Sequence, residues 1–327
     1  MEPVVDSARD STTAEIYRFF GSSEAQTSPV YQEWSLGIAD DPVVLALIDE
    51  LPPPKRQVNL VFAAARYAGV PIGGYAVFRQ WFTAHWAQVR AVAETHATQT
   101  NEAARCALLL PLLARIEGPI ALLEVGTSAG LCLYPDRYSY DYGERGRVDP
   151  PSGPSPATLQ CALSGPVPMP DRVPDVVWRR GIDLNPLNVR DVHDVTWLES
   201  LIWPEHEDRR ERLRAALSVV AEDPPVIVQG DLNERLPEVA ATAPSDATLV
   251  VYHTAVLAYL PEAARRRFVA TVTALPGHWI ANEGVRVVPG VAERLGDKRP
   301  EPGDFVLAYD GEPVAFAQSH GRWLRWL

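Results

Sequence analysis

The sequence is short of cysteine and of lysine. Its 327 residues include three cysteines, Cys106, Cys132 and Cys161, and only two lysines, Lys55 and Lys298. Three cysteines are an odd number without the spacing of zinc ligands, so neither a disulfide framework nor a metal site is expected. This cysteine content is typical of a reducing compartment.

The sequence also lacks an excess of positive charge and a long apolar run. It has 30 basic and 42 acidic side chains, which give a formal net charge of −12. Nucleic acid is therefore not an expected partner, because affinity for a phosphate backbone rests on clustered Lys and Arg. No apolar run reaches the roughly 18 residues of a membrane span, and the first residues lack the basic segment of a signal peptide. We expect a soluble, cytoplasmic protein without a nucleic-acid or membrane partner, and leave its oligomeric state open.

Helix signals dominate the first third of the chain. Asp41 and Pro42 supply a cap and a first-turn proline before the apolar residues 43–48. Further helices are expected over residues 55–67, 75–96 and 103–116, and no strand pattern interrupts them. The sequence predicts a helical cap domain over residues 1–117.

From residue 118 the pattern changes to strands that alternate with helices, which is typical of a parallel sheet. Five strands are expected, at residues 119–125, 175–183, 225–231, 247–252 and 278–283. Two more, at 305–309 and 313–318, flank Asp310-Gly311, a strong signal for a tight hairpin. The prediction is an α/β fold with a doubly wound, mostly parallel seven-stranded sheet in a domain over residues 118–327.

The most informative segment, Glu124-Val-Gly-Thr-Ser-Ala-Gly130, ends the first of these strands. Gly126 and Gly130 permit backbone turns and close approaches that a Cβ would block, and a following helix would offer free N–H groups to a bound molecule. We therefore expect a nucleotide-like cofactor here. The segment also contains Gly-x-Ser-x-Gly, the elbow of serine hydrolases with Ser128 as nucleophile, although that fold places strands before the elbow where this chain has helix signals.

Four strand ends, in chain order, resemble the cofactor loops of S-adenosylmethionine-dependent methyltransferases. Residues 124–130 resemble the Glu-x-Gly-x-Gly-x-Gly loop, with Ser128 in place of the middle glycine. Residues 181–186 resemble the second strand end, whose acid holds the ribose hydroxyls. Residues 230–232 resemble the third, near the adenine, and residues 251–257 the fourth, beside the methyl donor. The whole chain, including residues 98–106 and 138–143, also resembles an uncharacterised bacterial domain-of-unknown-function family with a methyltransferase-like C-terminal part.

This resemblance implies S-adenosylmethionine as cofactor and methyl transfer to a small-molecule acceptor. Asn101 and Arg105, just before the first strand, are candidates to reach the methionine carboxylate, the arginine through a bidentate pair, although Asn101 could simply cap a helix. The cofactor-binding residues predicted in this way are Asn101, Arg105, Glu124, Gly126, Thr127, Ser128, Gly130, Asp183, Leu184, Asn185, Asp231, Leu232 and His253.

His253 is also the candidate catalytic base. It follows a buried strand at the cofactor-facing end, and a histidine titrates near working pH. A core histidine satisfied by the backbone is an equal alternative, because methyl transfer to many acceptors needs alignment more than proton removal. A non-catalytic descendant of the fold that only binds a nucleoside is therefore a second functional alternative.

An insertion over residues 134–172 separates the glycine loop from Asp183. The ribose acid usually lies about 20 residues after the loop, so Asp141 is a rival; Asp183 is favoured because it stands at a strand end. Residues 138–142 and 157–163 could pair as a hairpin in a lid over the site. The tyrosines at 138, 140 and 142, with Trp81 and Trp86, could shape an acceptor pocket or simply pack in a core. From the acidic charge we expect an uncharged or cationic acceptor.

Overall fold

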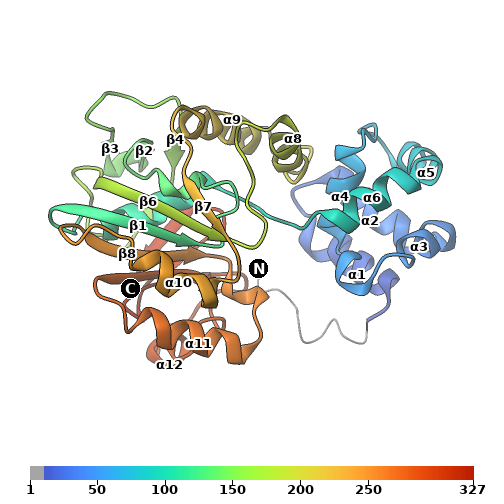
Figure 1. Ribbon diagram of the computed structural model, residues 1–327. Helices are drawn as coiled ribbons and strands as arrows, with labels where there is room; N and C mark the ends of the chain where they lie inside the picture. The colour runs from blue at the N-terminus through green and yellow to red at the C-terminus, as the bar shows by residue number, and fades with distance from the viewer. Residues whose placement is uncertain (1–10) are drawn as a thin grey trace. The chain divides into compact units, whose positions relative to one another are not determined.

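The computed structural model describes residues 11–327 (Figure 1). The described chain divides into two compact units, each with its own core. We call residues 11–100 with 190–211 the helical unit, and residues 101–189 with 212–327 the sheet unit. The division differs from the predicted boundary at residues 117/118, because 101–117 belong to the sheet unit and 190–211 to the helical unit.

The helical unit is held together by an aromatic core. Phe62 is fully buried, and its ring centroid lies 4.7 Å from that of Tyr31, 5.4 Å from Trp34 and 5.9 Å from Phe78. The elements of this unit are α1 (Thr13–Phe19), η1 (Phe20–Glu24), α2 (Pro29–Ala39), α3 (Pro42–Ile48), η2 (Pro53–Lys55), α4 (Val58–Tyr67), α5 (Tyr75–Ala84), α6 (Trp86–Thr95) and α8 (Val192–Ser200).

Two sequence predictions can be checked in this unit. Asp41 caps α3 as predicted, because its carboxylate accepts hydrogen bonds from the N–H groups of Val43 and Val44. The single helix expected over residues 75–96 is instead two helices, α5 and α6, which meet at His85. Trp86 is buried and donates its indole N–H to Glu50, so it acts as a core residue of this unit.

The sheet unit contains a nine-stranded, mostly parallel sheet. Its strand order is β5-β12-β11-β10-β9-β8-β1-β6-β7. The strands are β1 (Pro119–Val125), β5 (Ala162–Ser164), β6 (Asp175–Asp183), β7 (Val226–Gln229), β8 (Thr248–Thr254), β9 (His278–Gly284), β10 (Phe305–Tyr309), β11 (Glu312–Ala317) and β12 (Trp323–Trp326). The five predicted parallel strands are confirmed, as is the β10–β11 hairpin, in which Asp310 and Gly311 both have positive φ.

The prediction of seven strands was wrong, because two short strands extend the antiparallel edge. β12 pairs with β11, and β5, from the insertion, pairs in parallel with β12. Each has only three or four residues, too few for an alternating pattern to stand out. None of the helices described over residues 11–327 is long and apolar enough to cross a membrane.

Helices α10 (Leu232–Ala240) and α11 (Glu262–Val272) lie on one side of this sheet (Figure 1). Leu236 and Phe268 from these helices pack with Leu123, Val251 and Trp279 in one apolar core. These strand residues alternate with residues such as Glu124 and Asn282, which therefore lie on the opposite face. The remaining helices of the unit are η3 (Ala103–Arg105), α7 (Cys106–Leu113), η4 (Leu131–Leu133), η5 (Gly143–Arg145), η6 (Leu257–Tyr259) and α12 (Val291–Arg294), while α9 (Glu207–Glu222) spans the division between the units.

The insertion forms a second, three-stranded sheet of β2 (Ser139–Asp141), β3 (Arg147–Val148) and β4 (Thr158–Gln160). The predicted hairpin was wrong: β2 pairs in parallel with β4 and antiparallel with β3. Tyr138, Tyr140 and Tyr142 are buried, and their hydroxyls donate to backbone carbonyls at 2.6–2.9 Å. Their burial agrees with the alternative in which these tyrosines pack in a core and do not shape an acceptor pocket. They anchor the insertion in the core of the sheet unit.

Candidate functional site

The glycine loop, residues 126–130, lies where the order of the parallel strands reverses. The chain runs from β1 to β6 and β7 on one side of β1, and then returns to β8 and β9 on the other. Open α/β sheets bind small molecules in the crevice at the carboxyl ends of the strands at this point. The topology therefore places the predicted loop at a position suited to a ligand site.

Two residues that follow the carboxyl ends of neighbouring parallel strands have an unusual backbone. Ser128, in the loop after β1, has φ 53°, and Ala255, directly after β8, has φ 59°. Residues with a Cβ rarely adopt this conformation, because it costs roughly 1–2 kcal/mol. Such strain is often found at functional sites. The third non-glycine residue of this kind among those described, Asp310, is explained by its hairpin turn.

Asp183 is brought directly to the loop, as the sequence predicted. One carboxylate oxygen accepts the N–H of Ser128 at 2.7 Å, and the other accepts the N–H of Asn185 at 2.8 Å. Leu184, between them, is 62% exposed. The rival Asp141 lies in β2, where its carboxylate accepts the N–H of Gly143 at 2.9 Å in a local turn.

The expected helix after the loop was wrong. The loop leads into η4, a single 3-10 turn of three residues, and then into the insertion. Pro135 disfavours a helical conformation at Tyr134, whose φ of −120° is outside the helical range. The N–H of Leu131, which could have faced a ligand, donates to the side-chain oxygen of Asn101 at 3.0 Å.

The glycines of the site make room for the protein's own side chains. A Cβ on Gly130, whose φ is +77°, would lie 2.6 Å from Cγ of Pro225. A Cβ on Gly126 would meet Val256 even more closely. Packing within the protein therefore already requires glycine at position 130.

Glu124, at the end of β1, is buried and bonded to the loop. The hydroxyl of Thr127 donates to its carboxylate at 2.6 Å. Burial raises the pKa of Glu124 to about 8, with the Thr127 hydrogen bond and the nearby charge of Arg105 acting in the opposite direction. The side chain is therefore mostly protonated at neutral pH.

His253 is fully buried, and both of its ring nitrogens are engaged. The indole N–H of Trp279 donates to Nε2 at 3.1 Å, so Nε2 is the unprotonated nitrogen. Nδ1 therefore carries the proton and donates it to Glu283 at 2.7 Å. The same Glu283 oxygen accepts the N–H groups of Val256 and Leu257. This geometry agrees with the alternative in which His253 is a core histidine, although its ring is satisfied by side chains and not by the backbone.

The other predicted residues are more dispersed. Asp231 caps α10 by accepting the N–H of Asn233 at 2.8 Å, and Leu232 is buried in the core beneath it. Arg105 is buried and reaches the end of β8, where it donates to the carbonyl oxygen of Thr254 at 3.0 Å. Sequence reasoning missed Asn282, at the end of β9, because a single asparagine in an apolar strand gives no signal.

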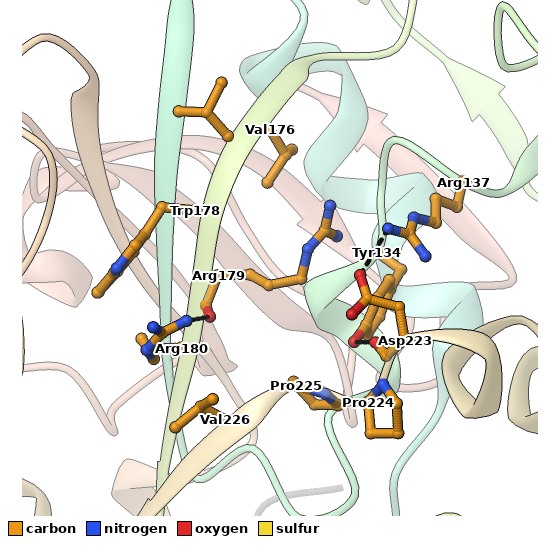
Figure 2. A pocket seen from close by; sticks show the side chains of 11 residues that line it. Tyr134, Arg137, Val176, Trp178, Arg179, Arg180, Asp223, Pro224, Pro225 and Val226 are labelled. Carbon is orange, nitrogen blue, oxygen red and sulfur yellow. Dashed lines mark hydrogen bonds and ion pairs between the residues drawn. The ribbon is translucent and has the colours of Figure 1, made fainter.

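A hollow of about 410 Å³ lies away from this site, where β6 and β7 begin (Figure 2). Two of its three arginines are paired with acids, and the third, Arg180, donates to the carbonyl of Arg179. Arg179 forms a bidentate pair with Asp136, and Arg137 pairs with Asp223 at 2.8 Å, as Figure 2 shows for the second pair. The hollow therefore offers little uncompensated charge to a ligand.

The chain matches one known protein family over nearly its whole length. Residues 14–326 match the family described as "uncharacterized protein conserved in bacteria" (DUF2332), and the chain belongs to that family. No curated protein and no solved structure matches the chain.

Proposed function

We propose that this member of the family binds S-adenosylmethionine at the carboxyl ends of β1, β6 and β8 and transfers its methyl group to a small-molecule acceptor. One observation carries the proposal: the Asp183 carboxylate at the end of β6 accepts the N–H of Ser128 in the glycine loop, at the point where the strand order reverses. The order of the five parallel strands, and the strained residues Ser128 and Ala255 after β1 and β8, support it.

The residues present fit an adenosyl group better than a dinucleotide. Asp183 stands at the end of β6, the position from which an acid reaches the ribose hydroxyls in nucleotide-binding sheets, and its carboxylate is held against the loop by the N–H groups of Ser128 and Asn185. The three-residue turn η4 provides no helix N-terminus for a pyrophosphate. S-adenosylmethionine has no phosphate, so its binding does not require a helix N-terminus.

In this proposal the protein contributes binding and alignment. Bound S-adenosylmethionine would supply an activated methyl group on a positively charged sulfur, which carries its own leaving group. Asp183 would hold the ribose, and the loop fixed by Glu124 and Thr127 would form the floor of the site. Because both nitrogens of His253 are engaged, we expect the acceptor atom to react without proton removal by that ring.

Calorimetry with Asp183→Ala tests the proposal. We expect the wild-type protein to bind S-adenosylhomocysteine and Asp183→Ala to bind it roughly 10- to 100-fold more weakly, since a charged hydrogen-bond acceptor worth ~1.5–3 kcal/mol is lost. Asp141→Ala is the matched control and should change the affinity little. No binding by the wild-type protein at millimolar ligand would reject the cofactor, and a larger effect at Asp141 would move the ribose site into the insertion.

A nucleoside-binding protein without catalysis is the second candidate, and the engaged ring of His253 favours it. Its signature would be tight binding of S-adenosylhomocysteine without turnover of any acceptor. The serine hydrolase alternative is less compatible with the geometry, because the elbow serine of that fold stands before a helix and Ser128 stands before the 3-10 turn η4.

A further inference from the structure

Arg105 is a buried cation without a carboxylate partner in the described chain. Its side chain is 5% exposed, and its guanidinium donates to three oxygens that carry no full charge. These are the carbonyl of Ser319 at 2.8 Å, the carbonyl of Thr254 at 3.0 Å and the hydroxyl of Thr254 at 3.3 Å. Buried charges in proteins are usually paired with an opposite charge, so this arrangement calls for an explanation.

Asn282 is a second buried polar group, and it lies beside the first. It is 0% exposed, and neither its side-chain oxygen nor its side-chain nitrogen has a hydrogen-bond partner. In the parallel pairing of β8 with β9, Asn282 is in register with Thr254, so the two side chains project from the same face of the sheet. Thr254, which accepts hydrogen bonds from the Arg105 guanidinium, is therefore the neighbour of Asn282 on the adjacent strand.

Unpaired buried polar groups are rare in native proteins and usually indicate a missing water, ion or ligand. Glu124 is close enough to Arg105 for their charges to interact, but burial raises the pKa of Glu124 to about 8, so this acid is mostly uncharged at neutral pH and leaves most of the positive charge uncompensated. The hydrogen bonds to Ser319 and Thr254 engage Nε and Nη1 of Arg105, which leaves the Nη2 donors of the guanidinium and the NH₂ donors of the Asn282 amide for a further partner. A planar group with two negatively charged oxygens would satisfy these donors.

We infer that Arg105 and Asn282 bind the carboxylate group of a small organic acid at the carboxyl ends of β8 and β9. The inference deepens the proposed function, on which it rests for the role of this acid: the acid is the methyl acceptor. Asp183 stands at β6, on one side of β1, whereas β8 and β9 follow on the other side, so the nucleoside and the acid occupy different ends of the crevice. A carboxylate replaces the uncharged or cationic acceptor that the net charge of the chain had suggested.

The test compares carboxylates with their amides in the presence of S-adenosylhomocysteine. The probes are acetate, propionate and benzoate against acetamide, propionamide and benzamide, measured by calorimetry. We expect the wild-type protein to bind at least one acid ten times more tightly than its amide. Asn282→Leu and Arg105→Gln should lose that preference, and Arg105→Lys, which keeps the charge without the planar fork, should retain part of it.

Thermal unfolding separates binding from a structural role. Asn282 has no hydrogen bond to lose in the free protein, so Asn282→Leu should keep or raise the melting temperature while the acid preference disappears. A lower melting temperature would show that the amide is satisfied by internal water and would overturn the inference. If Asn282→Leu does not fold, the two Arg105 variants test the inference instead. Arg105→Gln should lose the preference for the acid over its amide, and Arg105→Lys should retain part of it.

Two further ligands identify the source of the carboxylate. S-adenosylhomocysteine carries one on its amino-acid arm, and methylthioadenosine is a related nucleoside without that arm. If Asn282→Leu loses affinity for the first and not for the second, the carboxylate bound there belongs to the cofactor, and the inference that it belongs to the methyl acceptor is overturned. Unchanged affinity for both, with no preference for acids in the wild type, overturns the inference and leaves the proposed function standing. If the wild-type protein prefers acids but binds neither nucleoside, the carboxylate site is supported and the proposed function is rejected.

Discussion

Replacement of His253 by phenylalanine should destabilise the protein rather than remove a catalytic base. The ring is fully buried between Trp279, which donates to Nε2 at 3.1 Å, and Glu283, which accepts from Nδ1 at 2.7 Å. Phenylalanine has a similar size, so His253→Phe leaves little cavity. It does leave the indole N–H of Trp279 without an acceptor and takes one donor from Glu283.

The expected cost follows from these two losses. A buried N–H without a partner costs ~1–3 kcal/mol, and a hydrogen bond to a charged group contributes ~1.5–3 kcal/mol. The sum is about 2.5–6 kcal/mol of unfolding free energy, a large part of the stability of a typical protein. The N–H groups of Val256 and Leu257 still bind Glu283, so the carboxylate keeps two of its three donors.

Urea unfolding followed by circular dichroism measures this cost, and His278→Phe is the matched control. His278 lies at the start of the same strand β9 and pairs with Asp310 at 2.9 Å, but both side chains are about one third to one half exposed, so its loss should cost less than 1 kcal/mol. A general base would show the opposite pattern at His253. Unfolding free energy within 1 kcal/mol of wild type, together with a 10²- to 10⁴-fold loss of methyl transfer, would refute our reasoning.

Three further predictions concern the glycine loop and the end of β1 that precedes it. Gly130→Ala should lower the unfolding free energy by about 2–4 kcal/mol, through its positive φ and the contact with Pro225, and an unchanged melting temperature would contradict this. Ser128→Ala should keep methyl transfer, and mass spectrometry should find no fluorophosphonate adduct on wild-type Ser128. If Ser128 were a nucleophile, its replacement would abolish activity and the wild-type serine would carry the adduct. For Glu124 the folded pKa of about 8 exceeds the ordinary 4.5, so the unfolded chain releases the proton first. The unfolding free energy should therefore fall as pH rises through this window, by at most ~1.4 kcal/mol per pH unit, and urea titrations of Glu124→Gln should lack that fall.

The central sheet was predictable because buried parallel strands leave a strong local trace. β1, which is buried from Ile120 to Val125, has the bounds that its apolar run predicted, and β6 also has its predicted bounds, 175–183, although most of it is half-buried or exposed. The Asp310-Gly311 turn likewise determines its hairpin locally, since few residues tolerate positive φ at both positions. In each case the energetic preference lies within a few consecutive residues.

The insertion was not predictable for the opposite reason. Its strands have two or three residues each, and the parallel pairing of β2 with β4 is decided by contacts of residues far apart in the sequence. A hairpin is the shortest way to pair two nearby strands, which is why the sequence favoured it. The buried hydroxyls of Tyr138 and Tyr140 show what fixes the real arrangement, because both donate to carbonyls of the chain that follows the glycine loop.

The site was only partly visible in the sequence. Asp183 stood at a recognisable strand end, and the structure places it against the loop. The pair of Arg105 and Asn282 is visible only through the register of β8 with β9, since the two residues are 177 positions apart in the sequence. The net charge of −12 describes the whole surface and says nothing about the sign of a buried group such as Arg105.

The glycine motif alone is not sufficient evidence for a ligand site. Val256 and Pro225 fill the spaces that a Cβ at Gly126 and at Gly130 would need, so packing alone accounts for both glycines. The left-handed backbone of Ser128 and Ala255 has no such explanation, because glycine would relieve the strain at either position and neither is glycine. These two residues follow β1 and β8, which are neighbours in the sheet. Strain after two neighbouring strands is therefore a better argument for a ligand site than the glycine spacing that first drew attention to the loop.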